Sequence, residues 1–418
     1  MKRTWAPAWW QRLRSLGSNL SPNIWVQIGV SALGGFYRNG LVAVWQPFVL
    51  YLGGSVTLLG LLESLGGWGG LISSGMQLLG GWLADRLGRR PVVILSSVLT
   101  ALAMLHYTLA AALHCWPLLI PGVVFAGMGL VGRAASNSLT AESVREENRG
   151  LAYSLPMFAY IAPGVVSSVI AGQVTERWKY LPVVLACTIL EGLVLLILVR
   201  FLRETRRAED RRGRPPGERF DLRGTLRGVR RLLWLLVPLA GDSFSWGIAL
   251  SLLFGILKDR YDFSDGQLGW INAFFSLSWA IAQIPVGRLV DRHGCKRFLL
   301  VSEVMSAGCI VLLIFWPTFL GVSIAYALLG VTAALWVPAL LKMIAGSVSE
   351  KTRGMVMGLV FTVQGLGRFP SPMLAAWLYS TWGYTMPLLA GLGGACVVIV
   401  LIAVLVRDPP ANAPAAGG

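Results

Sequence analysis

Residues 80–93 read GGWLADRLGRRPVV, and a near copy, VGRLVDRHGCKRFL, returns at residues 286–299. The first stretch places Asp85, Arg86, Arg89 and Arg90 between two long segments that carry almost no charge. Such a cluster is expected in a short loop where a chain leaves a membrane and re-enters it. The second copy raises the question of whether the whole surrounding unit is repeated.

The composition is that of a membrane protein. The chain has 418 residues, of which 55% are hydrophobic and only 13% are charged, which is more apolar surface than one soluble core could bury. Its 17 Trp and 49 Gly fit this class, because Trp favours the bilayer interface and small residues let helices approach closely. The N-terminus is basic without a cleavable apolar core, so we expect no secretory signal.

Apolar windows of about 20 residues, the length that spans a hydrocarbon core of ~30 Å, recur along the chain. They predict an all-α membrane protein with twelve transmembrane helices. The windows lie near residues 24–52, 57–84, 91–111, 117–140, 150–173, 180–201, 232–257, 266–290, 298–315, 318–341, 354–378 and 383–406.

The distribution of basic residues predicts the orientation. With the N-terminus inside, 29 of the 36 Lys and Arg fall in cytoplasmic segments or helix ends, four in outside loops and three within spans. This obeys the positive-inside rule. The net charge of +16 is therefore explained by orientation against an anionic inner leaflet, and we expect no nucleic-acid partner.

A polar segment divides the chain into two halves of six spans. Twelve basic residues lie between Arg200 and Arg231, in a stretch that contains Pro and Gly, which predicts a cytoplasmic linker. The predicted units are a cytoplasmic N-terminal segment (1–23), an N-terminal six-helix bundle (24–203), the linker (204–230), a C-terminal six-helix bundle (231–406) and a cytoplasmic tail (407–418).

The two halves repeat each other. Asp85 recurs as Asp291 at an offset of 206, and the sequence EENRG at 146–150 recurs as EKTRG at 350–354 at an offset of 204. Matches at nearly one period, each at the same place in the helix order, indicate a duplicated unit. Both charge clusters then lie in the cytoplasmic loop between the second and third helix of their half.

The opening stretch resembles the loop signature of the major facilitator superfamily. The matching residues are Gly81, Leu83, Ala84, Asp85, Arg86, Gly88, Arg89 and Arg90. The twelve-span, six-plus-six organisation and the long central loop match this family over nearly the whole chain, and the pattern is most similar to drug:proton antiporters. The resemblance implies a secondary active transporter that works by alternating access.

The charge cluster is predicted to control the conformation. Gly81 would let the second helix approach a neighbour, and Asp85, one turn on, would meet a facing helix end and Arg89. The resemblance implies an inner latch between the halves, with Glu142 completing a charge relay. The alternative is that these ions only fix the topology. The predicted switch residues are Gly81, Asp85, Arg86, Gly88, Arg89, Arg90 and Glu142, with Gly287, Asp291, Arg292 and Gly294 in the second copy.

The second copy lacks part of this relay. Cys295 occupies the position of Arg89, and the position of Glu142 falls at Gly346 or Ser347. Because the arginine and the acid are missing together, only the N-terminal half is expected to carry the complete relay.

Charged residues within spans are predicted to line the transport path, since each is costly in a bilayer and faces the protein interior. Arg38 lies about 21 Å along the first helix from Ile24, and Asp242 is its repeat partner at an offset of 204. The predicted substrate- and proton-binding residues are Arg38, Asp242, Arg133, Asn137, Arg368, Gln364, Glu63, Trp246 and Trp336.

Several of these assignments have alternatives. Arg38 and Asp242 could form a static ion pair, and either Trp could simply pack in the core. Glu191, midway along the sixth span, could face a neighbouring helix or a lipid head instead of the transport path. We predict that Asp242 carries the exchanged proton, with Glu63 as the competing candidate.

Enzymatic function finds little support in the sequence. The three His lack the HExxH spacing, the five Cys form no CxxC pair, and there is no Walker loop. We predict no cofactor and no metal.

The sequence predicts proton-coupled efflux of an amphipathic, drug-like small molecule, by a monomer in the inner or plasma membrane with both termini cytoplasmic. The alternatives are transport of an organic anion or zwitterion, including a lipid-like one, and a membrane sensor or enzyme on a transporter scaffold. The spans contain three of the identified Arg and three of the identified acids, so their charges balance and do not predict the charge of the substrate.

Overall fold

The computed structural model describes residues 21–67, 69–144, 149–205, 222–347 and 360–408. Within these ranges the regular structure is helical and contains no strand, which confirms the all-α prediction. Nine helices among the described residues are long and apolar enough to cross a membrane. Three predicted spans fall outside this set, near residues 24–52, 266–290 and 354–378.

The N-terminal half contains the first six spans. They are α2 (Pro22–Tyr51); α3 (Val56–Gly66) with α4 (Leu71–Leu87); α5 (Arg89–Leu113); the short turn η1 (Trp116–Leu118) with α6 (Leu119–Gly129) and α7 (Gly132–Glu142); α8 (Arg149–Trp178); and α9 (Leu181–Phe201).

The C-terminal half contains the other six. They are α11 (Leu222–Leu250) with α12 (Leu253–Tyr261); α13 (Asp265–His293); α14 (Cys295–Phe315); α15 (Phe319–Ser347); a helix over residues 360–368 followed by α17 (Ser371–Trp382); and α18 (Thr385–Leu405).

Residues 222–230 of the predicted linker are helical and form the start of α11. The sequence explains this difference. Leu222, Leu226, Val229 and Leu233 recur every three or four residues, which is the spacing of one face of an amphipathic helix. Residues 206–221 of the predicted linker, 1–20 of the N-terminal segment and 409–418 of the tail lie outside the described residues.

The second span is divided at a glycine-rich break. Gly67 ends α3, and Gly69 has a φ of +86°, a left-handed conformation that glycine adopts without strain. The Ser73 hydroxyl donates hydrogen bonds to the carbonyl oxygens of Gly66 (3.1 Å) and Gly67 (3.0 Å). These bonds satisfy carbonyl groups that the break leaves without a helical partner, as a low-dielectric environment requires.

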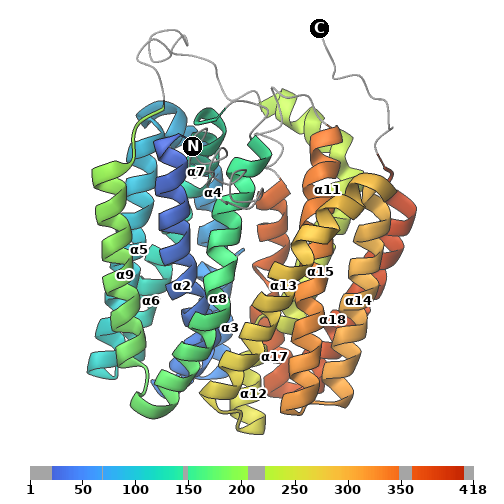
Figure 1. The fold of residues 1–418 in the computed structure, drawn as a ribbon. Coiled ribbons are helices and arrows are strands. Elements are labelled where there is room, and N and C mark those ends of the chain that lie inside the picture. The colour runs from blue at the N-terminus through green and yellow to red at the C-terminus, as the bar shows by residue number, and fades with distance from the viewer. Residues whose placement is uncertain (1–20, 68, 145–148, 206–221, 348–359, 409–418) are drawn as a thin grey trace, which may run out of the picture.

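The two halves lie side by side (Figure 1), with the N-terminal half in blue to green and the C-terminal half in yellow to red. They meet mainly where α8 packs on α13 and α3 packs on α17. The α8–α13 contact is close because glycines face each other: a Cβ on Gly269 would lie 3.2 Å from the Cα of Gly172. Small residues permit such close helix contacts in a membrane.

One apolar core spans both halves, whereas the others belong to one half each. The shared core contains Leu52 and Tyr180 from the N-terminal half and Phe263 and Tyr384 from the other, all near predicted outside loops. We call it the joint core. Towards the predicted cytoplasmic end, the buried clusters of the described residues are separate: one within 235–406 and three within 24–202. Among the described residues, the buried apolar core that the halves share therefore lies towards the predicted outer end.

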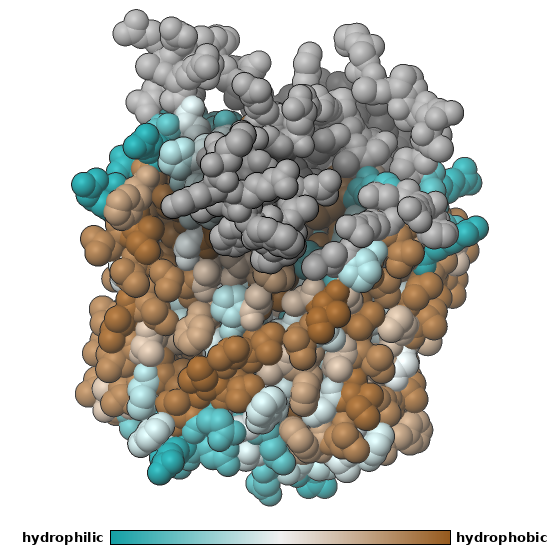
Figure 2. Space-filling model, viewed as in Figure 1, coloured by the Kyte–Doolittle hydropathy of each residue, from teal (hydrophilic) through white to brown (hydrophobic). Residues whose placement is uncertain are grey.

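The outer surface fits a bilayer. Figure 2 shows apolar side chains forming a broad belt over the visible face, with hydrophilic side chains near its edges. Large apolar residues remain exposed on the helices, including Ile189 of α9 at 63% and Ile281 of α13 at 65%. Exposure of this extent in mid-helix is expected where lipid tails cover the side chain.

Candidate functional site: charged groups inside the helical bundle

Arg38 lies near the middle of α2, and its ion-pair partner is Glu191 of α9. The Arg38 Nη2 and Glu191 Oε2 atoms are 4.0 Å apart, and the Arg38 side chain is 41% exposed whereas that of Glu191 is 1% exposed. Asp242 is not within ion-pair distance of Arg38 among the described residues, so the static Arg38–Asp242 pair considered from the repeat is not formed in this structure.

Glu191 faces the protein interior rather than lipid. Its carboxylate accepts a hydrogen bond from the Ser97 hydroxyl at 2.6 Å and another from the Tyr37 hydroxyl. Tyr37 in turn accepts a hydrogen bond from Arg38 Nε at 2.8 Å. Glu191 therefore belongs to a buried network that ends at Arg38, and its lipid-facing alternative is excluded.

Asp242 of α11 has a second carboxyl group as its neighbour. Its side chain is within hydrogen-bonding reach of Glu303 of α14, and Arg368 is the nearby cation. Glu303 is 4% exposed. Sequence reasoning missed Glu303, although a single acid in the apolar stretch FLLVSEVMSAGC was a usable signal.

Arg368 connects the acids of the two halves. Its charge acts on Asp242 in the C-terminal half and on Glu63 of α3 in the N-terminal half. The Arg368 side chain passes the glycine-rich break, where a Cβ on Gly69 would lie 2.8 Å from Arg368 Cδ. The break therefore makes room for an arginine from the other half.

Aromatic residues surround this charged group. The Arg368 guanidinium carbon lies 5.7 Å from the centre of the Trp246 ring, within the range of a cation–π contact. The Trp45 Nε1 donates a hydrogen bond to Glu63 at 3.0 Å. The structure thus brings together the predicted residues Glu63, Asp242, Trp246 and Arg368, and it adds Glu303 and Trp45.

The remaining predicted residues are distributed around this centre. Arg133 of α7 lies 5.0 Å from the centre of the Phe361 ring across the boundary between the halves. Asn137 is exposed, and Gln364 is half-buried one turn before Arg368. Trp336 packs against the apolar core of the C-terminal half, which favours the packing role over ligand stacking.

The predicted relay residues of the N-terminal half are in contact. Arg89 Nη1 lies 2.8 Å from Asp85 Oδ1, and Arg89 Nη2 lies 3.1 Å from Glu142 Oε1. The Arg86 guanidinium lies 4.1 Å from the centre of the Trp82 ring. The Asp85–Arg89–Glu142 cluster, which we call the relay, is therefore formed within one half.

The glycines of this loop have distinct roles. Gly88 and Gly294 have φ values of +102° and +86°, so both copies of the loop use a left-handed turn. A Cβ on Gly80 would clash with the Val131 carbonyl oxygen, whereas a Cβ on Gly81 would only reach the Ala134 side chain at 4.0 Å. Gly80 rather than Gly81 makes the tightest helix contact. Gly287, Asp291 and Arg292 belong to α13, but their side-chain surroundings lie outside what the structure describes.

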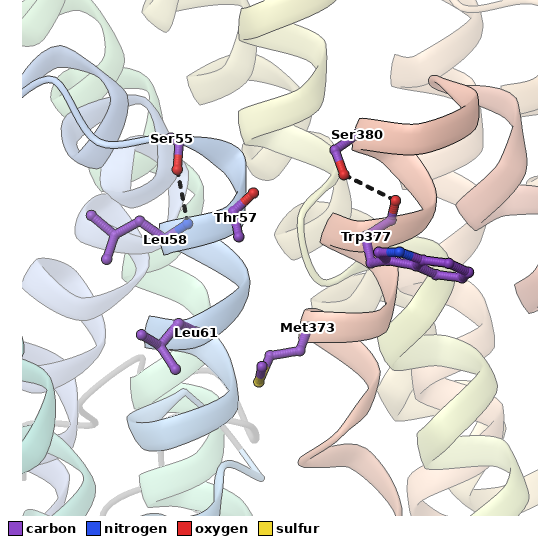
Figure 3. A pocket seen from close by; sticks show the side chains of 7 residues that line it. All are labelled: Ser55, Thr57, Leu58, Leu61, Met373, Trp377 and Ser380. Carbon is purple, nitrogen blue, oxygen red and sulfur yellow. Dashed lines mark hydrogen bonds between the residues drawn. The ribbon is translucent and has the colours of Figure 1, made fainter.

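A groove between the halves lies away from these charges. Figure 3 shows it between α3 and α17, with Leu61 and Met373 at the same level below Thr57 and Trp377. Its volume is about 410 Å³, and its lining contains no ionisable side chain. Leu61, Met373 and Trp377 are exposed, so this groove is an apolar surface feature at the predicted outer end and not the predicted binding site.

These features define a membrane transporter: two repeated helical halves that enclose charged residues from both. The family comparison makes the class specific, because the model of the Major Facilitator Superfamily matches residues 28–260 and again residues 239–418. The chain belongs to the Major Facilitator Superfamily. This assignment confirms the predicted fold and places the chain among transporters rather than enzymes.

Individual relatives are distant but cover most of the chain. The class G tetracycline resistance protein of Vibrio anguillarum is 28% identical over 311 residues, which are 72% of this chain and 76% of that protein. The multidrug resistance protein MdtG of Citrobacter koseri is 22% identical, covering 85% of this chain and 88% of that protein. A D-xylose-proton symporter structure superposes with a TM-score of 0.72 at 14% identity, covering 93% and 99% of the two chains.

Proposed function

We propose that this transporter exports an amphipathic, drug-like small molecule in exchange for protons. The similarity to a tetracycline resistance protein and to a multidrug resistance protein supports drug efflux. We further propose that it acts as a monomer in the inner membrane with both termini in the cytoplasm. The distribution of Lys and Arg supports this orientation.

The observation that carries the proposal is the chain of charges across the boundary between the halves. Glu63 belongs to one half, and Arg368, which lies between Glu63 and Asp242, belongs to the other. Movement of one half against the other would change these contacts. A change of protonation and a change of conformation would therefore be thermodynamically linked.

Asp242 and Glu303 are the proposed site of proton exchange. A hydrogen bond between two carboxyl groups requires a proton on one of them, and both groups lie inside the bundle, where the charge of Arg368 acts on Asp242. The predicted assignment to Asp242 is thereby extended to a pair. Glu63 stays the competing candidate, because its carboxylate also faces Arg368.

The joint core supports alternating access. In the present arrangement the halves share buried side chains near the predicted outer loops, while the described residues form separate cores towards the cytoplasm. This matches a state in which the outer end is closed. The opposite state would require the joint core to separate and the inner ends to approach each other.

The test is transport by purified full-length protein in liposomes. Tetracycline and a rhodamine dye would be supplied with and without an imposed pH difference, using protein-free liposomes and a protonophore as controls. We expect protein-dependent accumulation of at least one compound that requires the pH difference and is abolished by the protonophore. Transport that ignores the pH difference would contradict proton coupling.

A further inference from the structure

Arg38 is a cation at the inner edge of the joint core. Its neighbours in sequence, Tyr37 and Leu41, belong to that core. The carbonyl oxygen of Asn39 accepts a hydrogen bond from Asn272 of the other half at 3.3 Å. Arg38 therefore lies at the boundary between the halves, on the cytoplasmic side of the closure, and yet its side chain is 41% exposed.

The guanidinium of Arg38 is anchored by only one of its three nitrogens. Nε donates to the Tyr37 hydroxyl at 2.8 Å. Neither terminal nitrogen makes a hydrogen bond to another described residue, and Glu191 is 4.0 Å from Nη2. A guanidinium binds a carboxylate or phosphate through paired N–H groups, and here the terminal pair remains available.

Tyr37 and Glu191 fix the direction of this group. Glu191 is 1% exposed and accepts a hydrogen bond from the Tyr37 hydroxyl, so the Tyr37 oxygen turns its lone pairs towards Arg38 Nε. The Ser97 hydroxyl holds the second oxygen of Glu191 at 2.6 Å. The network thus holds the Arg38 guanidinium at Nε and leaves its two terminal nitrogens available. Because the group is already oriented, less conformational entropy is lost when an anion binds.

A second cation and an aromatic ring are connected to Arg38 through a shared neighbour, Tyr160. Arg38 and Arg133 both act electrostatically on Tyr160 of α8. Arg133 also contacts the Phe361 ring at 5.0 Å. A ligand held by Arg38 would therefore find positive charge nearby together with an aromatic surface from the opposite half.

We propose that Arg38 is the receptor for an anionic group of the substrate, positioned by Tyr37 and Glu191. The inference rests on the proposed transport function and makes its substrate class specific: an amphipathic molecule with a carboxylate or a similar anion on an aromatic body. Its overall charge is negative or zwitterionic.

The test is equilibrium binding to the purified full-length protein in detergent. The probes are a rhodamine dye with a free carboxylate and the methyl ester of the same dye, which differ only in the anionic group. We expect the wild-type protein to bind the carboxylate dye about tenfold more tightly, the value of one charge-assisted hydrogen-bonded contact.

The variants separate charge, position and folding. Arg38→Gln should abolish the preference while binding of the ester stays within about twofold, which also reports that the protein is folded. Arg177→Gln, on an exposed residue at the outer end of α8, is the matched control and should keep the preference. Tyr37→Phe should lower the preference to about threefold, because the charges stay but the anchor of Nε is lost. Glu191→Gln keeps an acceptor for Tyr37 and should retain the preference.

Two results would overturn the inference: equal binding of both dyes by the wild-type protein, or an Arg38→Gln variant that weakens both dyes equally. The latter would indicate a structural role. Binding is measured without a gradient, so a failure of proton-coupled transport in liposomes would leave this ratio unchanged and would count only against the proposed function.

Discussion

Glu204 and Asp408 make the same contact in the two halves of the molecule. Glu204 accepts hydrogen bonds from the backbone N–H groups of Arg89 (3.1 Å) and Arg90 (3.0 Å). Asp408 accepts them from Cys295 (2.7 Å) and Lys296 (2.8 Å). The two acids are 204 residues apart, which matches one of the two offsets, 204 and 206, at which the halves repeat. The duplication has kept this cap on α5 and α14 although Cys295 replaces the relay arginine.

Loss of either cap should destabilise the protein. A carboxylate at a helix N-terminus satisfies free N–H groups and interacts favourably with the helix dipole, so Glu204→Ala and Asp408→Ala should each cost about 1 kcal/mol. Thermal unfolding in detergent measures this. The Glu204→Gln variant should lose less stability, since its amide oxygen still accepts a hydrogen bond. The double Ala variant should show additive losses of stability, because the two sites are in different halves. Unchanged unfolding of both single variants would contradict the capping role.

The relay should govern transport rate more than ligand affinity. Asp85→Asn removes the charge that meets Arg89 at 2.8 Å. We expect a shift towards inward-facing forms and transport slowed up to about fivefold, since a partly exposed ion pair contributes at most ~1 kcal/mol. Ligand affinity should change only through that shift. Initial rates in liposomes and cysteine accessibility measure both effects.

Asp291→Asn is the matched control for the relay. Cys295 stands where Arg89 stands in the first copy, so Asp291 lacks that arginine and its replacement should slow transport less. Wild-type rates for Asp85→Asn would argue against a latch.

Proton coupling should depend on both carboxyl groups of the Asp242–Glu303 pair. Asp242→Asn and Glu303→Gln should each abolish uphill transport under an imposed pH difference and retain exchange of substrate at equal pH. Neither amide can release a proton, which is the physical reason. The Glu63→Gln variant is the comparison. If this variant loses uphill transport while the Asp242→Asn and Glu303→Gln variants still concentrate substrate, then Glu63 carries the proton.

The joint core predicts a cross-link that stops the cycle. A Cβ on Gly60 of α3 would lie 2.7 Å from the Cβ of Ala376 of α17, so a Gly60→Cys, Ala376→Cys pair is close enough for a disulfide after a small shift. Oxidation should hold the outer end closed and abolish transport, and a reductant should restore it. Each single Cys variant under the same oxidant is the control. Full activity of the cross-linked protein would show that the outer end need not open.

The orientation can be tested by labelling. A cysteine placed within residues 206–221 should react with an impermeant maleimide only after the membrane is permeabilised, because the positive-inside rule predicts that this segment is cytoplasmic. A cysteine at Lys179, in a predicted outside loop, should react in intact cells. Labelling of the linker cysteine in intact cells would contradict the predicted orientation.

The sequence by itself determined the all-helical fold, the repeat and the family. These follow from local quantities: the length of apolar windows, the side of the membrane on which Lys and Arg gather, and the recurrence of the loop around Asp85 at Asp291. It also identified Asp85, Arg89 and Glu142 as partners, because the resemblance concerned a compact loop and an adjacent helix end.

Only the tertiary structure decided which charges inside the bundle meet. The repeat suggested Arg38 opposite Asp242, but Arg38 is linked to Glu191 and Asp242 to Glu303. The physical reason is that a span's hydropathy fixes its length and not its rotation about its own axis. Contacts between residues far apart in sequence, such as Tyr37 and Glu191, depend on how every helix packs against its neighbours.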